Sequence, residues 1–212
     1  MKRIAAIFLV ISIPICCRDN EFMKPSPYKP PNDIREIIPT AVGLSWHFNR
    51  IGYREMPFEP FDTSMMKRSI IGWDHSNDTP YVAYRDSFYS KDAADLGEYE
   101  DYHSLITKDR YITYHGLNFS QGTQLLRAPI EKGNSWLYHE SDSSSGTVVI
   151  TNPDTVISIS GQTFEHAITL HANPTDDMLF NIDIFIVPQV GIVGERYIYR
   201  GGIFLELVSK NF

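Results

Sequence analysis

The chain has 212 residues, of which 42% are hydrophobic and 21% are charged, and its formal net charge is −7. This length and composition fit one folded domain and exclude a disordered or low-complexity chain. The acidic balance, with no clustered basic face, excludes nucleic acid as the main partner and simple electrostatic adhesion to anionic lipid. Removal of a leader holding Lys2 and Arg3 takes the charge from −7 to −9, so we expect an acidic mature surface.

The N-terminal segment has the pattern of a cleaved export signal. Lys2 and Arg3 precede an uncharged, mainly apolar stretch from Ile4 to Ile15. This stretch is long enough for the hydrophobic part of a signal peptide, but it is too short to span a bilayer as a stable helix. We therefore expect residues 1–16 to be a signal peptide that takes no part in the fold.

The two cysteines of the chain, Cys16 and Cys17, directly follow this stretch. Adjacent cysteines cannot cross-link a domain, and a metal site needs ligand pairs spaced along the chain. The arrangement resembles the lipobox of bacterial lipoproteins, in which a small residue precedes a cysteine that is lipidated and becomes the mature N-terminus. Because Cys17 follows the small Cys16 and Cys16 follows the bulky Ile15, the resemblance implies lipidation at Cys17, with Cys16 as the alternative. An ordinary secretory leader with incidental cysteines is the other interpretation.

Residues 17–33 are expected to form the lipidated N-terminus and a tether. Polar residues in this segment alternate with four prolines, Pro25, Pro27, Pro30 and Pro31. Such a composition favours extended polyproline II, and about 15 residues at roughly 3.1 Å each would hold a domain up to about 45 Å from a membrane. An arm that lies on the domain surface is the alternative.

A sequence element occurs twice, about 90 residues apart, at the start of the expected domain and in its middle. Its shared positions are Pro39, Gly43, Ser45, Trp46 and Phe48 in the first copy and Pro129, Gly133, Ser135, Trp136 and Tyr138 in the second. Proline fixes φ before a turn, glycine permits a reversal of the backbone, and the two aromatic residues of each copy point to one face of a strand. We expect two equivalent turn–strand units, each anchored by a buried tryptophan.

Most of the remaining pattern predicts strands. A short helix is expected only at residues 91–99, where Gly97 interrupts the pattern. Residues 147–151 and 155–160 predict the arms of a hairpin with a turn at residues 152–154. The other expected strands are residues 163–171, 178–187, and a last hairpin of residues 196–200 and 203–208 that turns on Gly201 and Gly202.

These elements place residues 34–212 in a single all-β or mainly-β domain. The fold class that they predict is an antiparallel meander, arranged as a sandwich or as an open, barrel-like sheet, with little helix. The repeated element, the hairpins and the run Val190-Gly-Ile-Val193 resemble a loose group of β-rich periplasmic or outer-membrane lipoproteins of unassigned function. The resemblance covers roughly residues 37–207, and it implies structural motifs without catalytic residues.

Four groups of residues are candidate sites. His166 and His171 are five apart, which puts them on opposite faces of a strand and argues against a shared metal. The Ser141–Ser145 run lacks a nucleophile elbow and is typical of a loop. The acidic run from Asp92 to Asp101 lacks the register of a calcium loop. The fourth group is the aromatic middle of the chain, which could line a ligand groove: Trp73, Tyr81, Tyr84, Tyr89, Tyr99, Tyr102, Tyr111 and Tyr114.

These observations favour a non-enzymatic binding or structural module that an N-terminal lipid anchors to the cell envelope. No metal or other cofactor is expected. Its partners are expected to be the membrane, through the lipid, and an envelope protein, a glycan or a lipid. Asp19 and Glu21, just after the cysteines, resemble the acidic segment that directs some lipoproteins outward, which favours the outer over the inner membrane. The alternatives are a carbohydrate- or lipid-binding β-module that uses exposed aromatic residues, and an envelope hydrolase with an unrecognised site.

Overall fold

The computed structural model describes residues 28–54, 60–75, 80–90, 95–115, 122–138, 146–174, 181–198 and 201–212. These residues form one short 3-10 helix, η1 (Ile34–Glu36), and twelve strands. None of the described helical residues belongs to a helix long and apolar enough to cross a membrane. The expectations for residues 1–16, Cys16, Cys17 and the loop around Ser141 lie outside the described residues.

The strands follow one another with short connections. In chain order they are β1 (Ser45–Arg54), β2 (Pro60–Asp74), β3 (Tyr81–Tyr89), β4 (Asp95–Ile106), β5 (Arg110–His115), β6 (Gly122–Arg127), β7 (Ser135–Leu137), β8 (Gly146–Ile159), β9 (Gln162–Pro174), β10 (Asn181–Val187), β11 (Gly191–Ile198) and β12 (Gly201–Lys210).

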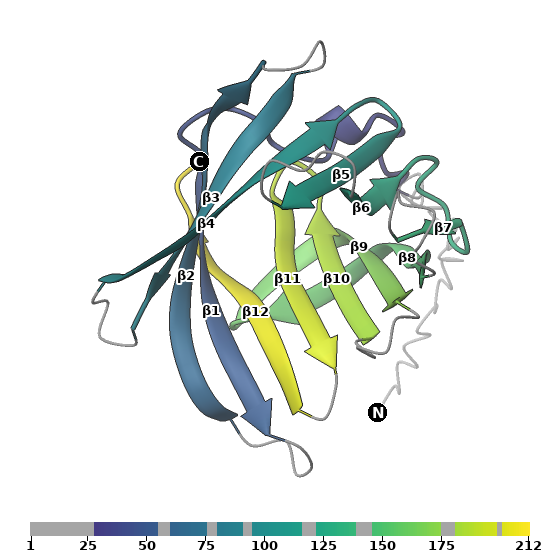
Figure 1. The fold of residues 1–212 in the computed structure, drawn as a ribbon. Helices are drawn as coiled ribbons and strands as arrows, with labels where there is room; N and C mark the ends of the chain where they lie inside the picture. Colours follow the sequence, from purple (N-terminus) through teal and green to yellow (C-terminus); the bar gives the residue numbers. More distant parts are fainter. Residues whose placement is uncertain are drawn as a thin grey trace, which may run out of the picture.

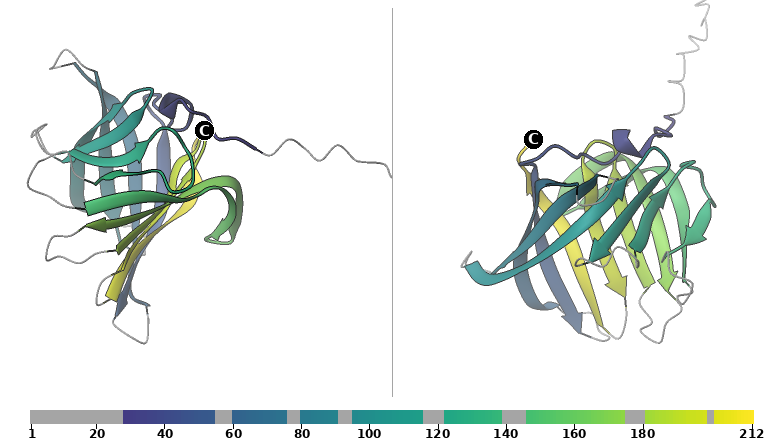
Figure 2. Two further views of the ribbon diagram at one scale, coloured as in Figure 1. Left: turned by 90° about the vertical axis from the view of Figure 1, so that its right-hand side faces the viewer. Right: turned by 45° about the horizontal axis from the view of Figure 1, so that its top comes forward.

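All twelve strands belong to one antiparallel sheet in the order β6-β5-β4-β3-β2-β1-β12-β11-β10-β9-β8-β7. Two six-stranded meanders, β1–β6 and β7–β12, therefore meet along the β1–β12 pair. The sheet curls until it is nearly closed into a barrel, as Figures 1 and 2 show. Between the two edge strands we find one backbone hydrogen bond among the described residues, from Gln124 N to Tyr138 O at 2.8 Å. The prediction of an antiparallel all-β meander is confirmed.

The core consists of two clusters of apolar side chains. One includes Ile150, Leu170 and Ile184, and the other includes Phe48 and Leu207. Alternation along the strands produces this arrangement, since successive side chains of a strand point to opposite faces. On β3, for example, buried and partly buried residues alternate from Tyr81 to Ser87.

The repeated element folds in the same way in both copies. Gly43 N donates to Ile70 O at 2.9 Å and Ile70 N donates to Leu44 O; in the second copy Gly133 N donates to Ile150 O at 2.8 Å and Ile150 N donates to Asn134 O. Gly43 and Gly133 have φ values of +90° and +84°, which favour glycine. Each element thus ties the start of β1 or β7 to the following long strand, β2 or β8.

Both tryptophans of the element are buried, with exposed fractions of 4% for Trp46 and 5% for Trp136. Each indole also donates a hydrogen bond to a backbone carbonyl: Trp46 Nε1 to Val190 O at 2.7 Å, and Trp136 Nε1 to Gln124 O at 2.8 Å. Each ring therefore connects its own strand to another part of the barrel.

The predicted hairpin turn at residues 152–154 is wrong. Asn152, Pro153 and Asp154 lie within one continuous strand, β8, where the register with β9 shifts between Ile150 and Ile157. The segment is a bulged bend because β9 pairs with β8 on both sides of it. The reversal of the chain comes later, at Ser160 and Gly161, which both have positive φ.

Two other local predictions are also corrected. Residues 95–99 of the expected helix form part of β4, where Tyr99 pairs with Ser87 of β3; residues 91–94 lie outside the described part. Gly201 and Gly202 belong to β12 rather than to a turn, since they pair with Arg54 and Tyr53 of β1. In both cases a neighbouring strand decides the conformation over local propensity.

The segment that precedes η1 packs against the domain from Tyr28 onward. The Tyr28 ring stacks on His166 at a centroid distance of 3.8 Å, and Pro30 is buried. Ile34 and Ile37 are fully buried, and Ile34 N donates to Lys108 O at 2.9 Å. η1 lies at the same end of the barrel as the C-terminus (Figure 2). Residues 28–33 of the expected tether thus lie against the domain, and an extended tether remains a proposal for residues 18–27.

Trp46→Ala and Trp136→Ala should each lower the free energy of unfolding by about 3–5 kcal/mol, because truncation leaves a cavity and removes an indole hydrogen bond. Chemical denaturation measures the effect. Trp73→Ala is the matched control, since that ring is 43% exposed and its loss should cost far less. Wild-type stability in both Trp46→Ala and Trp136→Ala would contradict the anchoring role.

Candidate functional site

The histidines do not converge on a metal site. His166 Nδ1 lies 3.0 Å from Asp154 Oδ1, and His171 Nδ1 lies 2.8 Å from Asp183 Oδ1. No group of three or more histidine, cysteine, aspartate or glutamate side chains is placed to hold a metal ion within the described part of the chain. The two histidines that the sequence singled out thus form separate hydrogen bonds with different aspartates.

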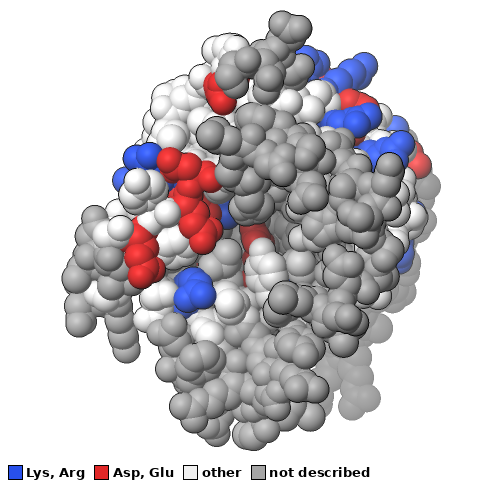
Figure 3. Space-filling model, viewed as in Figure 1, with Lys and Arg blue, Asp and Glu red and all other residues white. Residues whose placement is uncertain are grey.

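The described part of the acidic run is exposed to solvent. Glu98, Glu100 and Asp101 are exposed on β4, and acidic side chains gather over β3 and β4 in Figure 3. Arg85 of β3 binds Asp101 through Nε at 2.7 Å and Nη2 at 2.8 Å. The Arg85 hydrogen bonds, with some opposition from burial, lower the pKa of Asp101. This run is a solvated face with a cross-strand ion pair.

The aromatic middle of the chain divides by burial into three groups. Trp73 and Tyr99 are 43% and 62% exposed. Four of its tyrosines are buried instead: Tyr84, Tyr102, Tyr111 and Tyr114. Tyr84 and Tyr102 stack at a centroid distance of 5.1 Å inside the barrel. Tyr81 and Tyr89 are partly buried. Half of the aromatic residues that the sequence singled out therefore lie in the interior.

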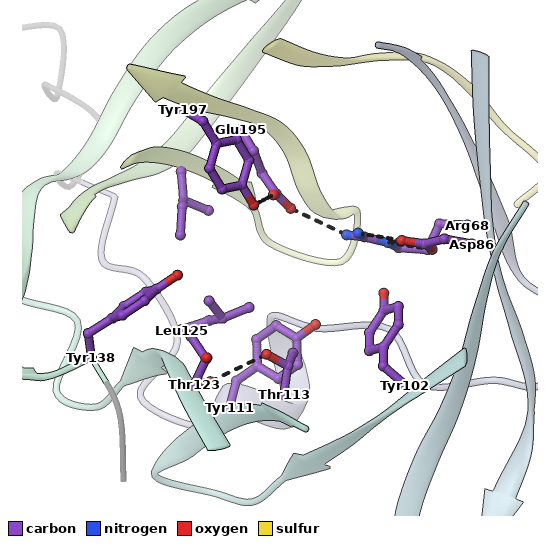
Figure 4. Close-up of a pocket in the computed structure, with 11 residues that line it drawn as sticks. Arg68, Asp86, Tyr102, Tyr111, Thr113, Thr123, Leu125, Tyr138, Glu195 and Tyr197 are labelled. Atoms are coloured by element: carbon purple, nitrogen blue, oxygen red, sulfur yellow. Dashed lines mark hydrogen bonds and ion pairs between the residues drawn. The ribbon is translucent and has the colours of Figure 1, made fainter. Parts of the chain in front are cut away.

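A cluster of buried charges lies among these rings. Arg68 of β2 faces Asp86 in the β2–β3 register, and its Nε and Nη2 atoms donate to the two carboxylate oxygens at 3.0 and 2.9 Å. Its Nη1 atom reaches Glu195 Oε1 of β11 at 3.4 Å. The Tyr197 hydroxyl donates to Glu195 Oε2 at 2.7 Å. We call Arg68, Asp86 and Glu195 the interior charge cluster (Figure 4).

The residues around Arg68 stabilise its protonated, positively charged form. The guanidinium lies 5.6 Å from the centroid of the Phe48 ring and 5.4 Å from that of Tyr102, within range of cation–π attraction. Burial by itself lowers the pKa of Arg68, but Asp86, Tyr102 and Glu195 outweigh it and raise the pKa well above its ordinary value. Arg68 is therefore a fixed cation.

A cavity of about 90 Å³ adjoins this cluster. It has roughly the volume of three water molecules. The lining comes from β2–β6, β10, β11 and the end of β7: Arg68, Asp86, Tyr102, Tyr111, Thr113, Thr123, Leu125, Tyr138, Ile184, Glu195 and Tyr197. In Figure 4 the Tyr138 and Tyr111 hydroxyls point toward its centre. Figure 3 shows an acidic side chain at the bottom of a hollow on this face.

The phenols around the cavity are protonated at neutral pH. Burial raises the pKa of Tyr111 to about 12. Burial, together with Glu195, raises the pKa of Tyr138 to about 12 and that of Tyr197 well above its ordinary value. These groups can donate and accept hydrogen bonds, but they are unsuited to take up protons near pH 7.

One sequence signal indicates this site, and it lies outside the motifs described above. Each charged residue occupies an inward position between apolar or aromatic residues of its strand: Arg68 lies between Met66 and Ile70, and Glu195 between Val193 and Tyr197. A charge at the inward position of an alternating strand marks a polar interior site.

Comparison with known proteins identifies the fold. No family model matches the chain, and none of the curated proteins matches it. A candidate exported protein from Bacteroides fragilis with a YmcC-like fold is 10% identical, with a TM-score of 0.51 over 83% of this chain and 99% of that one. The chain has a YmcC-like fold. A candidate lipoprotein from Parabacteroides distasonis is 12% identical, with a TM-score of 0.48 over 82% of this chain and 97% of that one.

Removal of the cation should destabilise this YmcC-like barrel. Arg68→Met leaves two buried carboxylates without their counter-ion, which should cost about 3–5 kcal/mol of unfolding free energy. The triple variant R68M/D86L/E195M should regain most of that loss, because apolar groups of similar volume replace the whole cluster. Chemical denaturation of both variants tests this.

Lys67→Met provides the control, since Lys67 is the preceding residue on β2 and points to the opposite face. It should unfold like the wild type. An Arg68→Met protein as stable as Lys67→Met would show that the interior charge cluster is solvated rather than buried.

Proposed function

We propose that this protein is a lipid-anchored cell-envelope module that binds a small polar ligand inside its barrel. The signal-like segment of residues 1–16 and Cys17 support export and anchoring. The similar structure from Bacteroides fragilis is described as that of an exported protein, which agrees with export of this chain. Asp19 and Glu21 favour the outer membrane.

The observation that carries the binding role is the polar cavity next to the interior charge cluster. A barrel interior that served only stability would be filled with apolar side chains, because replacing a buried ion cluster with apolar groups of similar volume is often neutral or stabilising. Here three charged residues and four tyrosines surround about 90 Å³ that their own side chains leave unfilled. Such convergent polar groups in a concave space are typical of ligand sites.

The lining favours binding over catalysis. Both carboxylates contact Arg68, and the Thr113 hydroxyl is directed to Thr123 O at 3.5 Å. Tyr111 and Tyr138, with pKa values of about 12, act as neutral hydrogen-bonding groups at neutral pH. These groups support the proposal of a non-enzymatic binding role.

Lipidation tests the anchoring part of the proposal. Cys17→Ala should yield unprocessed or soluble protein without the acyl mass, whereas Cys16→Ala should have a smaller effect. Intact-mass spectrometry of membrane-extracted protein measures both. Normal acylation of Cys17→Ala would contradict the assignment, and loss of acylation in Cys16→Ala alone would move the site by one residue.

Filling the cavity tests the binding part. Leu125→Phe adds volume to the cavity lining, so it should abolish the binding of small polar probes detected by ligand-observed NMR on the full-length protein. Val156→Phe is the matched control, because Val156 is 64% exposed and remote from the lining. If Leu125→Phe binds the probes as the wild type does, the site lies elsewhere.

A further inference from the structure

We infer that the cavity beside Glu195 binds the primary ammonium group of a small organic amine. This inference rests on the proposed binding function and specifies the ligand's chemistry. Arg68 contributes one positive charge to the interior charge cluster, and Asp86 and Glu195 contribute two negative charges. The ionised cluster thus has a net charge of −1, which a cationic ligand would balance.

The positive charge of Arg68 is not available to an anionic ligand. Two of its nitrogen atoms, Nε and Nη2, bind Asp86, and the third, Nη1, is directed to Glu195. The rings of Phe48 and Tyr102 lie beside the guanidinium. An anion in the cavity would face two carboxylates and a cation that is already neutralised, so electrostatics disfavours it.

Glu195 has acceptor capacity left for a ligand. Its Oε2 atom accepts one hydrogen bond from Tyr197, and among the described residues its Oε1 atom receives only the long 3.4 Å contact from Arg68. A carboxylate offers about four lone-pair positions, so further donors can bind it. An ammonium group supplies three donors in a compact shape.

The tyrosines complete a site of suitable shape and polarity. Neutral phenol oxygens of Tyr111 and Tyr138 point toward the cavity centre, where they can accept the remaining ammonium protons (Figure 4). Aromatic rings also attract cations. The volume of about 90 Å³ admits a group the size of methylammonium or ethylammonium, so a longer amine would extend toward the mouth.

Titration of the full-length protein with matched small probes tests the inference. The probes are ethylammonium chloride, the neutral isostere ethanol, potassium chloride and sodium acetate, followed by ligand-observed NMR and calorimetry. Ethylammonium should bind with a dissociation constant on the order of 1 mM. Ethanol, potassium and acetate should each bind at least about tenfold more weakly, because they lack the charge, the donors or the sign of charge.

Glu195→Gln should weaken ethylammonium binding about tenfold and leave ethanol binding unchanged, since it removes one charge and keeps the shape. Asp101→Asn is its control: it makes the same change of charge on the exposed face and should bind ethylammonium like the wild type. Should Glu195→Gln fail to fold, Tyr138→Phe keeps the cluster's charge and removes one phenol oxygen, and it should bind ethylammonium severalfold more weakly.

The outcomes separate this inference from the proposed function. Ethanol, potassium or acetate binding as tightly as ethylammonium in the cavity would overturn the ammonium preference and leave a polar binding site. Unchanged ethylammonium affinity in Glu195→Gln or Tyr138→Phe would also overturn it. Failure of every probe to bind at the cavity would count against the binding function itself.

Discussion

The buried guanidinium of Arg68 constrains which strand registers the native barrel can adopt. A charge in the interior is tolerated only when it is paired and hydrogen-bonded, so Asp86 must face it from β3 and Glu195 must reach it from β11. A slip of one residue in either register would turn the carboxylate to the outer face. The cluster therefore ties the register of the β2–β3 pair to that of a strand three places further along the sheet.

Close packing on the outer face supports the position of Glu195. A Cβ atom on the neighbouring Gly194 would lie 2.9 Å from Ile159 Cδ1 and 3.3 Å from Leu205 O, so only glycine fits there without displacement. The end of the β8–β9 hairpin packs against this point, and Gln162 Nε2 donates to Val208 O of β12 at 2.6 Å. A polar interior site thus rests on a tightly packed exterior contact.

Local pattern was sufficient for the fold class and insufficient for the site. Alternation predicted the strand at residues 178–187, of which residues 181–187 form β10, and the repeated element indicated two similar turns. It failed at Asn152–Asp154, where turn chemistry forms a bulge because β9 pairs on both sides. Arg68 is separated from Asp86 by 18 residues and from Glu195 by 127. The sequence of a single strand shows that a charged residue occupies an inward position. Its partners lie on other strands, and local sequence patterns do not predict which strands the closed barrel brings together.

The two copies of the repeated element illustrate the same limit at the level of packing. Trp46 belongs to β1, which pairs on both sides, and its indole binds the β10–β11 turn at Val190. Trp136 belongs to β7, at the edge of the sheet, and its indole binds Gln124 of the opposite edge strand. With the Gln124–Tyr138 backbone bond, this contact joins the two edges next to Thr123, Leu125 and Tyr138 of the cavity. One sequence element therefore anchors a continuous part of the barrel in the first copy and holds its seam together, beside the candidate site, in the second.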